Sequence, residues 1–159
     1  MSRPLAWTAV ALAAALAVVA AVLVLERPPG GPVEPAWDRQ ACAHCRMHLS
    51  ERGFAAQLHT ADGEVLHFDD PGCLWLWQRE QGVAAAAIYY RHLREERWLA
   101  EAETGFVRFD PTPMAWGFAA VERGTPGARA PEEARRAVLE RDGAAAPARG
   151  REEHVEPAR

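Results

Sequence analysis

The stretch FAAQLHTADGEVLHFDDPGCLWLWQRE, residues 54–80, decides the fold of this chain. It begins with two runs of alternating, strand-forming character, 54–60 and 64–68, which flank the tripeptide Ala-Asp-Gly. Gly63 can adopt the positive φ that a tight hairpin turn needs. The sequence therefore predicts a β-hairpin here.

The second part of the same stretch predicts a helix that follows the hairpin. Residues 69–72, Asp-Asp-Pro-Gly, supply an acidic N-cap and a proline suited to the first helical turn. We expect the helix over 73–80 and its end at Gly82. Residues 85–92, with isoleucine and two tyrosines, fit a third strand, so the first unit reads β-β-α-β.

The second half of the chain repeats part of this order. Residues 106–109 and 114–121 have the composition of strands, and 131–141 form an amphipathic helix with acids at its start. The sequence therefore predicts an α+β fold in which a small domain, residues 38–142, consists of two related β-β-α-β-type units. Residues 143–159 are too poor in apolar side chains to order themselves, and we expect a disordered tail.

An apolar run precedes the domain. Residues 5–25 carry no charge and are long enough as a helix to cross about 30 Å of hydrocarbon, while Arg3 favours a cytoplasmic N-terminus. No clear cleavage signal follows, which favours an uncleaved single-pass transmembrane helix over a removed signal peptide. Residues 26–37, rich in proline and glycine, read as a linker. The domain would face the periplasm or the outside of a bacterial inner membrane.

Composition limits the possible functions. With 159 residues, the chain has room for one modest domain beyond the anchor. A net charge of -4 offers no basic patch, so we expect no nucleic-acid partner. No Ser/His/Asp set and no phosphate-binding glycine loop is recognisable, so we expect no enzyme. The oligomeric state is not indicated.

Soft metal ligands gather in one short segment, Cys-Ala-His-Cys-Arg-Met-His at 42–48. The chain has only three cysteines and three methionines, so this grouping is unlike the rest of its composition. Met47 lies in the segment, and Met114 stands at the start of a predicted strand. Thioethers and thiolates bind Cu(I) in preference to hard cations, although a methionine can also simply fill a core.

The spacing of Cys42 and Cys45 leaves three readings open: a structural disulfide, a redox couple and metal ligation. A thioredoxin-like couple would need the pair at a helix N-terminus after a buried strand, and here it follows a loop. Closed zinc needs four ligands, which Cys73 or a histidine could complete. Cys73 alone also reads as a small buried side chain, and Asp69 and Asp70 read most simply as a helix cap.

Several short motifs together resemble one known family. They are Cys42-x-x-Cys45-x-Met47, Phe54-Ala-Ala-Gln57, Asp62-Gly63-Glu64-Val65, Phe68-Asp69-Asp70-x-Gly72-Cys73, Trp98-Leu-Ala and Met114-Ala-Trp-Gly117. In this order they resemble the NosL family of copper chaperones, which assist the maturation of nitrous-oxide reductase, and the resemblance covers about residues 42–121. It also implies two related β-β-α-β-type units.

The resemblance implies a membrane-tethered protein that binds one Cu(I) as its cofactor and delivers it to an apo-cuproenzyme client in the periplasm, namely nitrous-oxide reductase in a denitrifying cell. Carried over by position, Cys45, Met47 and Met114 are the expected metal ligands. Cys42, His48 and Cys73 are further candidates. A thiol-disulfide oxidoreductase using the Cys42–Cys45 pair is the alternative function, and a tethered module with a purely structural disulfide is a third.

Overall fold

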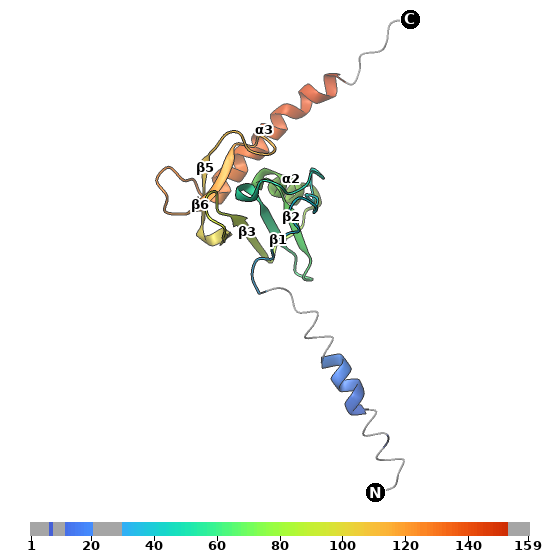
Figure 1. Ribbon diagram of the computed structural model, residues 1–159. Helices are drawn as coiled ribbons and strands as arrows, with labels where there is room; N and C mark the ends of the chain where they lie inside the picture. The colour runs from blue at the N-terminus through green and yellow to red at the C-terminus, as the bar shows by residue number, and fades with distance from the viewer. Residues whose placement is uncertain (1–6, 8–11, 21–29, 153–159) are drawn as a thin grey trace, which may run out of the picture. The chain divides into compact units, whose positions relative to one another are not determined.

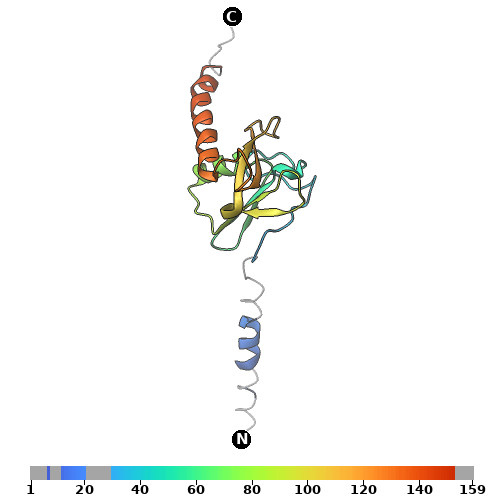
Figure 2. The same ribbon diagram turned by 90° about the vertical axis from the view of Figure 1, so that its left-hand side faces the viewer.

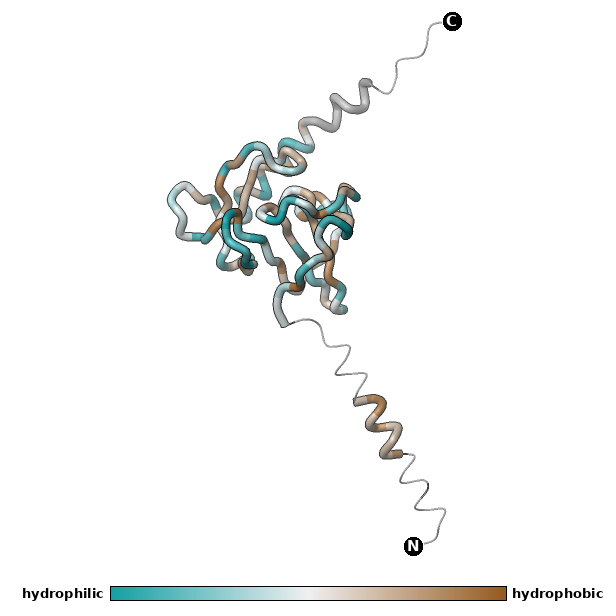
Figure 3. Tube along the Cα trace, viewed as in Figure 1, coloured by the Kyte–Doolittle hydropathy of each residue, from teal (hydrophilic) through white to brown (hydrophobic). Residues whose placement is uncertain are grey.

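The computed structural model describes Trp7 and residues 12–20 and 30–152 of the chain. The chain divides into two compact units, residues 1–31 and 32–159. In the first unit, 12–20 are helical and apolar, as the colouring of Figure 3 shows. No helix in the described part of the chain is long and apolar enough to cross a membrane, and much of the predicted anchor, 5–25, lies outside the described residues.

The second unit is a mixed α+β domain with antiparallel sheets (Figure 1). Four strands form one sheet in the order β2-β1-β3-β4: β1 Ala56–His59, β2 Val65–Phe68, β3 Ala87–Arg91 and β4 Trp98–Ala100. A two-stranded sheet pairs β5 Thr104–Arg108 with β6 Phe118–Glu122. The α-helices are α2 Pro71–Gln81 and α3 Pro131–Glu152, and short 3-10 turns occur at η1 Arg52–Phe54 and η2 Glu101–Glu103.

Local sequence signals form the first predicted β-β-α-β unit as expected. β1 and β2 pair around the turn at Gly63, whose φ is 92°. Asp70 caps α2, because its carboxylate accepts a 2.8 Å hydrogen bond from the Gly72 N–H, and Pro71 opens the first turn. The helix ends at Gly82 in the left-handed conformation. The predicted hairpin, helix and third strand are confirmed.

The core joins the two sheets through α2. Trp75 of α2 is 1% exposed, and its indole N–H donates to the Tyr90 hydroxyl on β3 at 2.9 Å. The same ring meets the edge of Phe106 on β5 at a centroid distance of 5.0 Å. α3 packs against α2 and β5, beside the two-stranded sheet in Figure 2. One helix therefore holds both halves of the domain together.

The second half departs from the sequence reading in three places. β6 begins at Phe118, because Ala115 and Gly117 take left-handed conformations, with φ of 55° and 78°, that a strand cannot continue through. Met114 thus lies in a loop, 110–117. β4 was not expected, and it exists because it pairs with β3. α3 continues to Glu152, whereas the sequence predicts the end of the helix at Arg141 and a disordered tail from residue 143. The alanine, arginine and glutamate residues of this segment favour a helix.

The segment before the domain is bound to the polar face of the large sheet. The Val33 N–H donates to Gln57 Oε1 at 2.9 Å, and the Val33 carbonyl accepts from His67 Nε2 at 3.0 Å. Glu34 pairs with Arg91 and accepts from the Trp98 indole at 2.8 Å. The end of the predicted linker therefore contacts the domain it precedes.

Candidate metal centre

The loop that carries Cys42 and Cys45 is a tight, hydrogen-bonded turn. The Cys42 N–H donates to the Met47 carbonyl at 2.8 Å, and the Arg46 N–H donates back to the Cys42 carbonyl at 3.2 Å. Arg46 closes the turn with a φ of 67°. A bond of 2.9 Å from the Ala43 N–H to the His67 carbonyl attaches the turn to β2. Both cysteines are therefore placed against the end of the hairpin.

Three thiols and one carboxylate meet where this turn touches α2. Ligand atoms of Cys42, Cys45, Cys73 and Asp69 all lie within 4.8 Å of one another. Cys42 and Cys73 are fully buried, whereas Cys45 is half-buried. The Cys45 thiol donates to Asp69 Oδ1 at 3.3 Å. We call these four residues the thiol cluster, and its donors are compatible with a bound metal ion.

The four members come from three local structures. Asp69 directly follows β2 and precedes the N-cap residue of α2, and Cys73 lies in the first turn of that helix. The helix N-terminus favours negative charge on a thiolate. Because the turn at 42–47 is bound to β2, it faces the same junction, and packing brings the distant cysteines together.

The three thiols of the cluster differ in their pKa values. A hydrogen bond from the Cys73 thiol, with further ones from the backbone at Asp69 and Cys45, lowers the pKa of Cys42 to about 6. Burial raises the pKa of Cys45 to about 12. The pKa of Cys73 is raised, because its thiol donates to Cys42 and is itself buried. A metal that binds all three sulfurs must therefore displace protons from the thiols.

The structure joins some of the sequence-predicted ligands and leaves others apart. Cys45 and two of the further candidates, Cys42 and Cys73, are in the cluster. Met47 is 58% exposed on the same turn. His48 is exposed and forms an isolated bridge with Ala41.

The loop of Met114 is fixed to the start of α2, beside the cluster. The Met114 N–H donates to Asp70 Oδ2 at 3.3 Å, so the N-cap carboxylate binds both the helix and the loop. Burial raises the pKa of Asp70 to about 6. Met114 itself is half-buried and packs against the core.

Asp69 is the cluster residue that sequence reasoning missed. The pair Asp69-Asp70 was interpreted as a helix cap, but only Asp70 caps the helix. A signal was present, because the residue directly before a first-turn proline is the one in the N-cap position. The preceding aspartate was therefore available for another role.

The three cysteines are free thiols in the structure. The chain matches no protein-family model, no curated protein and no solved structure among those compared with it.

Proposed function

We propose that the protein is a Cu(I)-binding metallochaperone, tethered to the bacterial inner membrane by residues 5–25, with its domain in the periplasm. The observation that carries the proposal is the thiol cluster, in which three sulfurs lie close enough to bind one ion. Cu(I) is a soft cation that thiolates bind strongly in two- or three-coordinate sites. The predicted resemblance to the NosL family agrees with this chemistry.

The exposure of the ligands supports delivery rather than permanent storage. Cys42 and Cys73 are fully buried, Cys45 is half-buried, and Met47 is 58% exposed on the same turn. In the proposed transfer, Met47 and Met114 supply thioethers at the outer side of the site, and a client's ligands replace them before they replace the buried thiolates. The proposed client is an apo-cuproenzyme, nitrous-oxide reductase. No catalytic step is required of the protein.

Binding of a structural zinc ion by four protein ligands is the second candidate function, and Asp69 favours it. Three thiolates and one carboxylate are four ligands, the number that a structural zinc ion takes, and two of the cysteines are fully buried. Such an ion would stabilise the fold instead of being delivered. The thiol-disulfide alternative has less support, because the thiol with the lowered pKa, Cys42, is buried and cannot reach a substrate disulfide.

Metal competition separates these functions. The full chain in neutral-detergent micelles is reduced under anaerobic conditions and titrated with Cu(I) against bathocuproine disulfonate, and with Zn²⁺ against a chromophoric chelator. We expect about one Cu(I) per chain, X-ray absorption dominated by sulfur scattering, and transfer to apo nitrous-oxide reductase. Wild-type Cu(I) affinity in a Cys45→Ser/Cys73→Ser variant that still folds would reject the assignment. A zinc ion that displaces Cu(I) and resists chelators would favour the structural site.

A further inference from the structure

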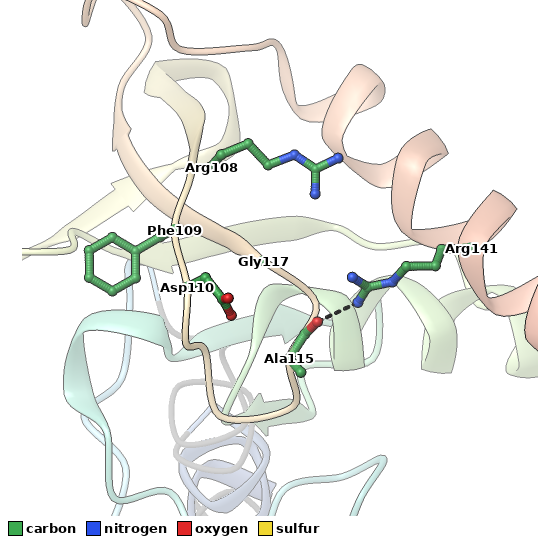
Figure 4. Close-up of a pocket in the computed structure, with 6 residues that line it drawn as sticks. All are labelled: Arg108, Phe109, Asp110, Ala115, Gly117 and Arg141. Atoms are coloured by element: carbon green, nitrogen blue, oxygen red, sulfur yellow. Dashed lines mark hydrogen bonds between the residues drawn. The ribbon is translucent and has the colours of Figure 1, made fainter.

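A second candidate binding site, separate from the thiol cluster, lies next to the 110–117 loop. A pocket of about 520 Å³ opens between the end of β5, the loop and α3 (Figure 4). Its lining residues are Arg108, Phe109, Asp110, Ala115, Gly117 and Arg141. Figure 4 shows the two guanidinium groups entering from β5 and from α3. None of these residues belongs to the thiol cluster.

Both guanidinium groups are held in place by aromatic rings. The Arg108 guanidinium carbon lies 4.3 Å from the ring centroid of Phe118, and that of Arg141 lies 4.7 Å from the Trp116 ring. Arg141 also donates to the Ala115 carbonyl at 2.5 Å. Because stacking already restricts these side chains, a ligand that binds them loses less conformational entropy.

The positive charge of the pocket is not neutralised. Neither Arg108 nor Arg141 forms a salt bridge with any residue in the described part of the chain, whereas Arg79, Arg91 and Arg97 each pair with a carboxylate. Asp110 supplies a single carboxylate to the lining. The pocket therefore has an excess of positive charge in a chain whose net charge is -4.

We propose that this pocket binds a carboxylate side chain from an acidic segment of a partner protein. A guanidinium binds a carboxylate through two parallel hydrogen bonds, and two such groups can hold it from both sides. Gly117 lines the pocket in a left-handed conformation, with a φ of 78°, that a larger residue would adopt only with strain. Asp110 disfavours a doubly charged phosphate more than a single carboxylate.

Phe109 favours a protein as the source of the carboxylate. Phe109 lines the pocket, and Figure 4 shows its ring on the other side of the strand end from the two guanidinium groups. The residue is 37% exposed, and its ring packs on Phe54 at a centroid distance of 5.5 Å. A partner protein that covers the end of β5 can contact this ring as well as the arginines, whereas a free anion would gain nothing from it. The pocket shares its loop with Met114, so a partner held there is close to the loop that reaches α2. The inference does not depend on which metal, if any, the thiol cluster binds.

The test uses the full chain in neutral-detergent micelles and a fluorescein-labelled peptide of alternating glutamate and leucine. We expect saturable binding by fluorescence anisotropy, weakened about tenfold or more in Arg108→Gln and in Arg141→Gln, which remove charge-assisted hydrogen bonds. Arg136→Gln is the matched control, because it removes the same charge from an exposed position on α3 and should leave binding unchanged.

The inference is overturned by the absence of saturable binding at millimolar peptide, by equal losses in Arg136→Gln and the pocket variants, or by wild-type binding in both pocket variants. Inorganic phosphate that displaces the peptide at lower concentration than acetate does would also overturn it, in favour of a free-anion site. Circular dichroism and urea unfolding of each variant show whether a loss of binding is a loss of folding. Arg108→Lys and Arg141→Lys, which keep the charge without the planar fork, should bind between wild type and the glutamine variants.

Discussion

Gly72 should not accept even a methyl group, although it lies in a helix where alanine is normally better. A Cβ at this position would lie 2.3 Å from Trp116 Cγ and 2.4 Å from Cδ1. The Arg141 guanidinium stacks on the same indole at 4.7 Å from the ring centroid, so a movement of the indole would also disturb that contact. Gly72→Ala therefore forces the 110–117 loop away from the first turn of α2.

Two opposing effects set the magnitude. Replacing a helical glycine by alanine gains about 0.5–1 kcal/mol, with less expected in the first turn. Overpacking a tight contact costs about 1–3 kcal/mol. The balance is a loss of up to about 2.5 kcal/mol in the free energy of unfolding. Since Met114 is bonded through its N–H to the same helix start, Cu(I) affinity should fall as well if its thioether is a ligand.

Urea unfolding followed by far-UV circular dichroism gives the measurement. Gly143→Ala in α3 is the matched control, because a Cβ there meets nothing within 4 Å and the helix should gain up to about 1 kcal/mol. In a Trp116→Ala background, Gly72→Ala should become neutral or stabilising, since the clash is gone. The reasoning is refuted if Gly72→Ala stabilises the otherwise wild-type chain as Gly143→Ala does.

Three further predictions concern the site and the core. Asp69→Asn should weaken zinc binding about tenfold or more while changing Cu(I) affinity little, because Cu(I) does not need a hard oxygen ligand; equal losses for both metals in competition titrations would contradict this. Burial lowers the pKa of His67 from its usual 6.5, and Gln40 Nε2 donates to its Nδ1 at 2.9 Å, so the fold prefers the neutral ring. As the pH falls below 6.5, the unfolded chain therefore protonates His67 before the folded chain does, and the free energy of unfolding should decrease. His67→Gln should flatten this decrease in urea midpoints measured from pH 7 to 5. An unchanged slope would reject the role of His67. Trp75→Phe removes the hydrogen bond to the Tyr90 hydroxyl and should cost about 1–3 kcal/mol in the same unfolding assay; an unchanged stability would show that the hydrogen bond from Tyr90 to Glu101, at 3.4 Å, is sufficient.

The first unit of the fold was predictable because its signals act over a few residues. The turn at Gly63, the cap at Asp70 and the stop at Gly82 each depend on one backbone conformation that the local sequence favours. The second unit was less predictable. A three-residue strand such as β4 has no pattern of its own, and its conformation depends on hydrogen bonds to β3.

The candidate site divides in the same way. The grouping of Cys42, Cys45 and Met47 is visible in the sequence, and it is the basis for predicting that the protein binds a soft metal ion. Sequence spacing could not show that Asp69 faces the thiols while its neighbour caps the helix, since both aspartates fit a cap. That the sulfurs of Met47 and Met114 bind a metal ion together with the thiols stays a prediction.

By itself, then, the sequence determined the hairpin, the helix that follows it and the presence of thiols and thioethers near one another in the chain. Only the tertiary structure decided that Cys73 joins the pair at 42 and 45, and that Arg108 and Arg141 share one pocket. The physical reason is that hydrogen bonds within a turn or a helical turn follow from neighbouring residues, whereas these two sites depend on how α2 and α3 pack against loops far away in the sequence.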